Sequence, residues 1–294
     1  MTVLRRFALV LAISATSVGA IAAAAAGDGG GPSPGISFGG AGVTGAGGVL
    51  RYVTVLGRTG TVVESIVRRN ARVLNWAPIV GLFGIPVVAF DGTAGGLSHD
   101  GKTLILSSYP SRPGPGAVSR FVVFDTSRYH VRRTIVLRGT YGFDAVAPDG
   151  STIYLIQYTS SKNWNRYRVR AFDLVRGRLL AGAIVDRRDP AEAMSGSPVT
   201  RVTSADGVWA YTLYTAPRGA NFVHALDTVH RRAFCVDLPW PHLAPGALQG
   251  VRMTVAGRRL VLTQPPVGRL AEVDRSSFSV SLLRKPVPDG GVVG

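Results

Sequence analysis

The chain has 294 residues but only one cysteine, three lysines and 17 acidic residues. A single cysteine, Cys235, excludes an internal disulfide framework and a thiolate metal cluster. With 33 basic residues the formal net charge is +16, which excludes functions that need a strongly acidic surface. Hydrophobic residues make up 46% of the chain and charged residues 17%, so the sequence can form a core and has too little charge for disorder.

The first 26 residues have the pattern of an export signal. Arg5 and Arg6 precede residues 7–26, which carry no charge and end in alanines that offer Ala-x-Ala cleavage sites. This apolar run also approaches the length of a membrane span, so an uncleaved signal anchor is the alternative. We therefore expect a secreted or extracytoplasmic envelope protein that contacts a membrane only if this segment is retained.

Residues 27–48 contain 11 glycines in 22 positions and no apolar periodicity. This composition predicts a flexible linker. From Val49 onward, short runs rich in Val, Leu, Ile, Phe and Tyr alternate with Gly, Pro, Asp and Ser. Such runs are typical of β-strands, and no sustained helical stripe interrupts them. We therefore predict an all-β folded domain over residues 49–294.

Two kinds of turn marker recur at regular intervals. An Asp-Gly pair, degenerate in its last copy, precedes an apolar strand at separations of 49, 57 and 50 residues: Asp100-Gly101, Asp149-Gly150, Asp206-Gly207 and Ala256-Gly257. A second aspartate closes a later strand at separations of 48, 54 and 47 residues: Asp125, Asp173, Asp227 and Asp274. An earlier copy beginning at Arg51 fits the same frame without its aspartate. Five copies of about 50 residues, each with four short strands, predict a β-propeller.

The repeated aspartates have structural explanations. Asp-Gly pairs form tight hairpin turns, because the glycine accepts a positive φ and the aspartate caps the turn. We expect the second series to accept hydrogen bonds within the turn between the third and fourth strands. Neither series has the alternating carboxylates of a calcium loop.

Residues 147–155 read APDGSTIYL and resemble the S-P-D-G-x-x-L-Y-V blade signature of bacterial YVTN-type, lactonase-like propellers of the WD40-like class. Residues 97–104 are similar, and the resemblance covers roughly residues 50–285. It implies about seven blades and lactonase-like hydrolysis. This chain has room for five, and the first lacks an inner strand. Either residues 36–43 or the C-terminal tail supplies that strand and closes the ring, or an open arc is completed by a partner.

Few residues point to catalysis. Five histidines are scattered without metal-ligand spacing: His99, His130, His224, His230 and His242. The Gly-x-Ser-x-Gly signature of serine hydrolases is absent. Cys235 alternates with apolar neighbours and is predicted to be a buried small hydrophobe. We therefore predict no catalytic residues, no metal site and no cofactor.

Inner strands of propeller blades converge on one axis, and this geometry selects three residues. Counting back from each Asp-Gly turn places Asp144, Arg201 and Arg252 at equivalent polar positions. These side chains either pair with one another as an ion network or bind a small anionic or carbohydrate-like ligand in the central channel.

Paired arginines suggest a second interaction surface. Three pairs fall near the same outer hairpin of different copies: Arg68-Arg69, Arg132-Arg133 and Arg231-Arg232. A basic rim suits anionic envelope polymers or phospholipid head groups, whereas a merely solvated outer face is the alternative. Nucleic acid is not expected as a partner, because no recognition module is present.

Three functions are compatible with these observations. The sequence favours an exported, non-catalytic binding or scaffold module at the cell envelope, because that needs only the fold, the export signal and the charge. The alternative that the resemblance implies is a lactonase-like hydrolase, for which Asp144 is the evident acidic group in the channel. The third is a structural component, an open arc that completes itself through oligomerisation.

Overall fold

The structure is a computed structural model that describes residues 33–109, 113–188, 194–215, 221–240, 243–244 and 246–288. The predicted signal at residues 1–26 and His242 lie outside the described residues. Within them, every named element is a β-strand, which confirms the all-β prediction. No helix in this part of the chain is long and apolar enough to cross a membrane.

Five antiparallel sheets form five blades, each with its strands in chain order. The first blade contains β2 (Val43–Thr44), β3 (Leu50–Leu56), β4 (Gly60–Val67) and β5 (Arg72–Val80). The second contains β7 (Thr103–Ser107), β8 (Val118–Asp125) and β9 (His130–Arg138). The third contains β10 (Tyr141–Val146), β11 (Thr152–Tyr158), β12 (Tyr167–Asp173) and β13 (Arg178–Leu179).

The last two blades have the same order. The fourth contains β14 (Ser197–Thr203), β15 (Trp209–Thr215), β16 (Asn221–Asp227) and β17 (Arg232–Leu238). The fifth contains β18 (Arg252–Ala256), β19 (Arg259–Gln264), β20 (Gly268–Asp274) and β21 (Val280–Leu282). Two short strands outside the blades, β1 (Gly35–Ser37) and β6 (Ile85–Val87), pair with each other. The predicted number of five copies is confirmed.

The predicted linker boundary at residue 48 needs a correction. Strand β2 lies inside the glycine-rich segment and pairs with β3, where Val43 faces Tyr52, so it supplies the strand that the first blade was expected to lack. The glycines serve tight turns here rather than flexibility. Gly42 has a φ of +61°, and a Cβ at this position would lie 2.0 Å from the Tyr52 carbonyl oxygen. The described part of the glycine-rich segment therefore belongs to the propeller.

The second blade is the one with a reduced inner strand. On its inner side β7 is met by two isolated bridges, Leu97 with Leu104 and Gly84 with Ser107, and by the hydrogen bond from the Ile105 amide to the Gly96 carbonyl at 2.8 Å. Glycines at 95 and 96 weaken a strand here, because glycine loses more backbone entropy on ordering and has no side chain to pack.

Each hydrophobic cluster joins neighbouring blades. Val63 and Leu106 share the cluster between the first and second blades, and both are fully buried. Corresponding clusters connect the second blade to the third, the third to the fourth and the fourth to the fifth. A single sheet cannot bury both its faces, so the stacking of successive blades provides the core.

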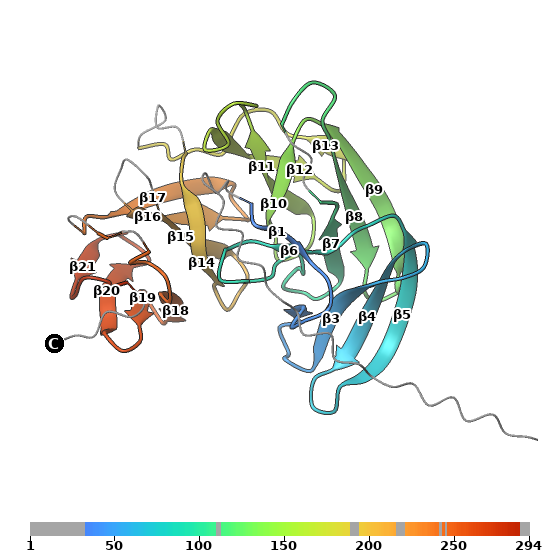
Figure 1. Ribbon diagram of the computed structural model, residues 1–294, viewed down its shortest axis with the longest axis horizontal. Coiled ribbons are helices and arrows are strands. Elements are labelled where there is room, and N and C mark those ends of the chain that lie inside the picture. The colour runs from blue at the N-terminus through green and yellow to red at the C-terminus, as the bar shows by residue number, and fades with distance from the viewer. Residues whose placement is uncertain are drawn as a thin grey trace, which may run out of the picture.

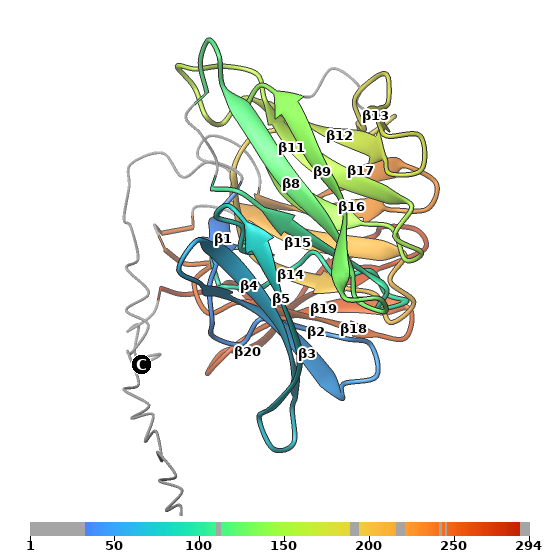
Figure 2. The same ribbon diagram turned by 90° about the vertical axis from the view of Figure 1, so that its right-hand side faces the viewer.

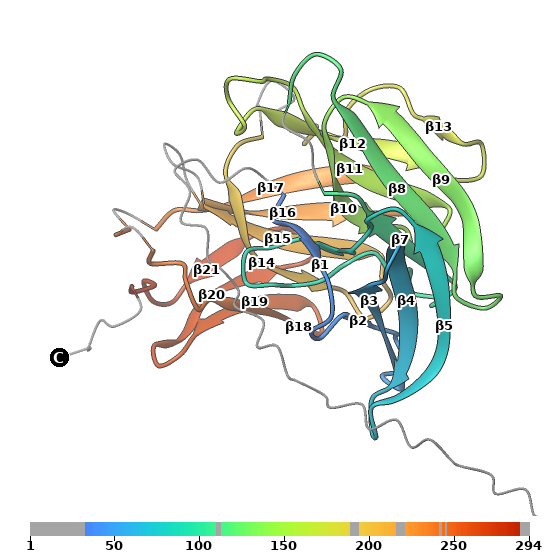
Figure 3. The ribbon, with the colours of Figure 1, turned by 45° about the vertical axis from the view of Figure 1, so that its right-hand side comes forward.

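The blades follow one another along an open arc. Figure 1 shows the ribbon of the last blade, in red, standing apart from that of the first, in blue. Figures 2 and 3 show successive sheets face to face with their neighbours. Among the described residues, no hydrophobic cluster contains both the first and the fifth blade. Of the two arrangements left open by the sequence, the structure has the open arc.

The two series of turn aspartates have the structural roles that the sequence predicts. In the Asp-Gly turns, Asp149 Oδ1 accepts the Ser151 amide at 2.9 Å, and Gly150 has a φ of +68°. In the later turns, Asp125 Oδ1 accepts the amides of Ser127 and Arg128 at 2.9 and 2.8 Å. These backbone hydrogen bonds fix where each following strand begins.

Candidate functional site

The centre of the arc contains a cavity of about 560 Å³. It is lined by residues from the inner segments of the first four blades and from the turns that follow them. Because equivalent positions of different blades meet here, this cavity corresponds to the central channel that the repeat predicts. Its lining includes Thr44, Gly95, Asp144, Arg201 and Ser204.

Asp144 and Arg201 form a buried ion pair in the wall of this cavity. Arg201 Nη2 contacts Asp144 Oδ1, Arg201 Nη1 donates to the Asp144 carbonyl, and Arg201 Nε donates to Thr212 Oγ1 at 2.7 Å. The Arg201 side chain is only 6% exposed and the Asp144 side chain 1% exposed. Taking two charges out of water is costly unless they are paired and hydrogen-bonded, and this arrangement meets both conditions.

A β-bulge positions the aspartate. In the ladder between β10 and β11, Phe143 faces Leu155 and Ala145 faces Tyr154, so Asp144 has no partner in the register. A bulge bends the strand and re-aims the extra side chain. Asp144 thereby reaches Arg201 on β14, across the boundary between the third and fourth blades.

The second carboxylate oxygen of Asp144 remains available. Asp144 Oδ2 is buried and has no hydrogen-bond partner among the described residues. A buried acceptor without a donor costs free energy, so such an atom in a cavity wall is a site for a hydrogen-bond donor from a ligand or water. The pair therefore presents a compensated charge and one open acceptor.

Arg252 does not join this pair. It begins β18 in the fifth blade, is exposed, and donates through Nη1 to the Val251 carbonyl at 3.2 Å. It is not among the residues that line the described cavity, whose strands come from the first four blades. The structure thus brings two of the three predicted channel residues together, and their role in ligand binding stays a prediction.

His224 is a neighbour of the pair that sequence reasoning did not single out. It faces Thr212 in the register of β15 and β16 and is 1% exposed. Burial lowers the pKa of its imidazole to about 4, partly opposed by the nearby Asp144 carboxylate. Its Nε2 has no hydrogen-bond partner among the described residues. The alternation of Phe222, His224 and Leu226 on β16 was the available signal, because it places the histidine on the apolar face.

Cys235 differs from its prediction as a buried side chain. It is half-buried on β17, and its Sγ lies 4.0 Å from His224 Nδ1. The Cys235 amide donates to Asp186 Oδ2 at 2.8 Å. Phe234 and Val236 on either side of it pack towards the fifth blade, whereas Cys235 packs against the cluster between the third and fourth blades.

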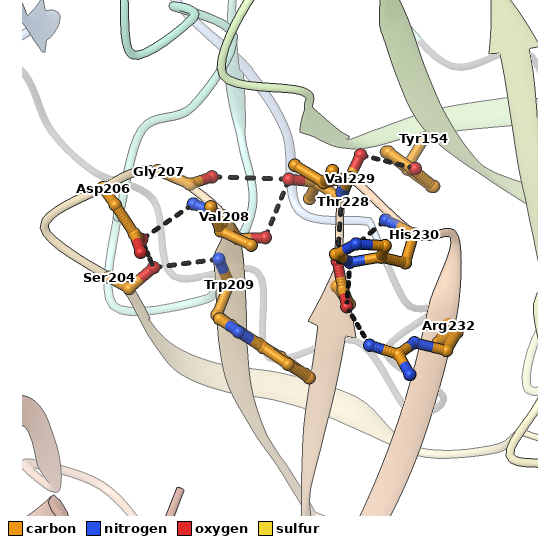
Figure 4. Close-up of polar contacts among 11 residues, drawn as sticks. Tyr154, Ser204, Asp206, Gly207, Val208, Trp209, Thr228, Val229, His230 and Arg232 are labelled. Carbon is orange, nitrogen blue, oxygen red and sulfur yellow. Dashed lines mark hydrogen bonds and ion pairs between the residues drawn. The ribbon is translucent and has the colours of Figure 1, made fainter. Parts of the chain in front are cut away.

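Beside the cavity, polar contacts order the turns of the fourth blade, and one of them ties the third blade to it (Figure 4). Thr228 Oγ1 donates to the Val208 carbonyl at 2.8 Å, and the Tyr154 hydroxyl donates to the Thr228 carbonyl at 2.8 Å. Ser204 Oγ accepts the Trp209 amide at 2.9 Å. Ser204 and Thr228 both line the cavity, so these contacts fix part of its wall.

In the part of the chain that the structure describes, no group of three or more His, Cys, Asp or Glu side chains is arranged to hold a metal ion. The cavity lining contains one carboxylate, Asp144, and one imidazole, His99.

The sheets, their order and their radial packing define a β-propeller. No family model matches the chain, and no curated protein matches it. Among solved structures, it is similar to hydrazine synthase of Kuenenia stuttgartiensis, at 16% identity and a TM-score of 0.42 over 79% of this chain and 75% of that one. It is also similar to TolB from Acinetobacter baumannii, at 11% identity and a TM-score of 0.43 over 83% of this chain and 54% of that one.

A third similar structure is a functionally unknown protein from Desulfotomaculum acetoxidans DSM 771, at 12% identity and a TM-score of 0.48 over 82% of this chain and 68% of that one. At such identities the likeness concerns the fold alone. The resemblance to YVTN-type, lactonase-like propellers stays a prediction from the blade signature.

Proposed function

We propose that this chain is an exported, non-catalytic binding module whose central cavity takes a small neutral molecule rich in hydroxyl groups. The observation that carries the proposal is the open Asp144 Oδ2, which is buried in the cavity wall beside a compensating Arg201. The charge pattern of residues 1–26 supports export.

Charge compensation favours a neutral ligand over an anion. Arg201 directs three of its five N–H donors at Asp144 and Thr212, so most of its hydrogen-bonding capacity is used within the protein. An anion would approach a pair with no net charge and an acceptor oxygen that repels it. A hydroxyl group, in contrast, donates a hydrogen bond to that oxygen.

The remaining lining suits the same ligand. The volume of about 560 Å³ falls within the range of roughly 300–1,000 Å³ that is usual for small-molecule sites. Six hydroxyl side chains line the cavity together with small apolar residues: Thr44, Thr93, Ser98, Thr203, Ser204 and Thr228. Such a mixture supports a carbohydrate-like ligand, which offers both hydroxyl groups and apolar C–H surface.

A binding role is favoured over hydrolysis by the contacts of the lining residues. A hydrolase of the nucleophile type needs a hydroxyl or thiol hydrogen-bonded to a base. Among the described lining residues, no hydrogen bond joins a hydroxyl group to His99, and Asp144 is engaged with Arg201. Three lining hydroxyls do donate to carboxylates, but in each case the same Oδ1 atom also accepts a backbone amide of its turn, so the contact caps the turn: Thr93 to Asp91, Ser98 to Asp100 and Ser204 to Asp206. We therefore propose that the cavity holds its ligand without transforming it.

The test is calorimetric titration of the protein with a panel of neutral sugars and polyols, beside simple carboxylates and phosphates. Thr203→Phe places a ring in the cavity wall, and Thr254→Phe on the exposed β18 is the matched control. We expect binding of at least one neutral member, with affinity reduced about tenfold or more by Thr203→Phe because a filled cavity loses the contact. Thr254→Phe is expected to bind as the unaltered chain does.

Three outcomes would contradict the proposal. They are the absence of binding across the neutral panel, equal effects of the two phenylalanine variants, and conversion of the bound molecule to a product detected by chromatography. Preferential binding of anions would contradict its neutral-ligand part.

A further inference from the structure

A second cleft lies between the second and third blades, away from the central cavity. It has a volume of about 290 Å³ and is lined by Arg132 and Arg133 of β9, by Asp149 and Ser151 of the adjacent Asp-Gly turn, and by Leu174. We refer to these five residues as the inter-blade arginine cleft.

A β-bulge places both arginines in this cleft. In the ladder between β8 and β9, Val123 faces Arg133 and Phe124 faces Val131, so Arg132 is the extra residue. Consecutive residues of a regular strand point to opposite faces. The bulge removes that alternation, and two adjacent guanidinium groups line one cleft.

Neutral groups hold both guanidinium groups in place. Arg132 Nη2 donates to Thr103 Oγ1 at 2.8 Å, and Arg133 Nη1 donates to the Leu174 carbonyl at 3.2 Å. Among the described residues, neither arginine forms an ion pair with a carboxylate within 4.0 Å. The pKa of Asp125 is lowered mainly by a backbone hydrogen bond within its turn and further by the charge of Arg132 at longer range, so the two arginine charges are anchored by neutral groups and only partly compensated.

Other arginines of the hairpins differ in this respect. Arg176 and Arg232 each contact the aspartate of their own hairpin at 2.8 Å, and Arg258 in the β18–β19 turn contacts Asp274 at the end of β20 at 2.9 Å. The inter-blade arginine cleft contains one carboxylate, Asp149, whose Oδ1 accepts the Ser151 amide at 2.9 Å. Two cations and one anion leave a positive site with one additional acceptor.

Two glycines allow the third blade to approach these groups. A Cβ at Gly150 would lie 2.4 Å from Thr103 Oγ1, the atom that Arg132 holds. A Cβ at Gly177 would lie 2.5 Å from Arg133 Nη1. A larger residue at Gly150 would collide with Thr103, and one at Gly177 would displace the Arg133 guanidinium, so the close approach is part of the geometry of the cleft.

We propose that the inter-blade arginine cleft binds the phosphate group of a phosphorylated polyol. The planar guanidinium donors match the spacing of phosphate oxygens, and hydrogen bonds between ionised partners are the stronger kind. Asp149 accepts hydrogen bonds from the hydroxyl groups next to the phosphate. Glycerol phosphate has this chemistry both as a free molecule and as the head group of phosphatidylglycerol.

The experiment titrates the full chain with glycerol 3-phosphate, and in a second arm measures its sedimentation with phosphatidylglycerol vesicles against phosphatidylcholine vesicles. The cleft variant carries Arg132→Gln with Arg133→Gln. The control carries Arg68→Gln with Arg69→Gln, which removes the same charge from the β4–β5 turn. We expect the dissociation constant for glycerol 3-phosphate to rise about tenfold to a hundredfold in the cleft variant and to stay nearly unchanged in the control.

A third variant distinguishes the effect of the planar guanidinium donors from the effect of charge. Arg132→Lys with Arg133→Lys keeps the charge but lacks the planar donors, so an intermediate loss is expected. Thermal unfolding of each variant checks that the blades remain folded. If the cleft variant loses binding to both the vesicles and glycerol 3-phosphate, the lipid head group binds in this cleft. If it loses only glycerol 3-phosphate binding, the cleft binds the free phosphate ester and not the lipid.

Either of two results overturns the proposal. The first is equal weakening of glycerol 3-phosphate binding by the cleft variant and the control, which would mean long-range attraction to a basic surface. The second is the absence of glycerol 3-phosphate binding by the unaltered chain at low ionic strength, where charge-assisted contacts are strongest.

Discussion

At the scale of single residues, the repeat predicts the positions of Asp144 and Arg201 but not the contact between them. Their place on the channel axis followed from counting back along each copy, and the structure brings both to the central cavity. Their mutual pairing was one of two alternatives, because the bulge that turns Asp144 toward β14 has no marker in the residue types. Counting back from its turn places Arg252 at the equivalent position, but it belongs to the last blade of an open arc. No residue near it in the sequence indicates that the arc is open.

His224 leads to a prediction about pH. Its folded-state pKa is about 4, below the ordinary value of 6.5, because burial disfavours the imidazolium form. Between these values the unfolded chain binds a proton that the folded protein excludes, so the free energy of unfolding falls as the pH is lowered from 6.5 to 4 and levels off below. The expected loss is about 3 kcal/mol.

Urea unfolding at several pH values between 7 and 4 measures this loss. His224→Gln is expected to remove most of the slope within that window, because glutamine does not titrate. His130→Gln, at an exposed position of β9, is the control and is expected to retain the slope. A His224→Gln variant with an unchanged slope would show that other groups cause the pH dependence.

At the scale of strands and turns, the aspartate markers were sufficient to place most elements. They locate the turns of the last four blades because Asp and Gly have fixed roles in hairpins. A different feature of the same hairpins was not visible in the sequence. The residue that ends the turn before each outer strand has a positive φ in all five blades, yet its type varies: Ala71, Tyr129, Gly177, Arg231 and Phe278. Composition could not disclose this repeat, because the conformation is imposed by the hairpin and not by the residue.

The sequence also did not reveal strand β2, because its glycine-rich composition is typical of a linker. The glycines before it provide a test. Gly40 and Gly42 have φ values of +62° and +61°, so alanine at either position costs about 1–2 kcal/mol of backbone strain. At Gly42 the Cβ would also meet the Tyr52 carbonyl, whereas nothing lies within 4 Å of a Cβ at Gly40. Gly42→Ala must therefore separate β2 from β3.

We expect Gly42→Ala to lower the free energy of unfolding by roughly 3 kcal/mol or more and Gly40→Ala by only about 1–2 kcal/mol. Chemical denaturation of the two variants and the unaltered chain provides the comparison. Equal destabilisation would mean that the contact between β2 and β3 contributes little to the first blade.

At the scale of the whole molecule, the two ends of the arc differ. The free face of the first blade exposes apolar side chains, with Trp76 65% and Val80 91% exposed. On the fifth blade, Glu272 faces outward and pairs with Arg259 at 2.5 Å and Arg269 at 2.9 Å. The repeat period predicted the number of blades, but these end faces depend on which blade has no neighbour, and that is a property of the assembled arc.

The position of the domain boundary can be tested by truncation. A chain that begins at residue 49 lacks β1 and β2, and with them the hydrogen bonds from the Gly39 amide to the Thr54 carbonyl and from Thr54 Oγ1 to the Ser37 carbonyl. We expect its melting temperature to fall by roughly 10 °C relative to a chain that begins at residue 33. Scanning calorimetry of both chains measures the difference. Identical melting temperatures would support the linker that the composition suggests.

Each hydrophobic cluster of the described residues joins neighbouring blades, so a blade added at the end of the arc would need only the face of the blade beside it. Duplication of one 50-residue copy at the far end would add a sheet on an existing face and leave the earlier interfaces intact. Loss of an internal copy, in contrast, would bring together two blade faces whose side chains are not complementary in shape. A change in copy number at the far end would therefore leave the residues that line the cavity, which come from the first four blades, in place.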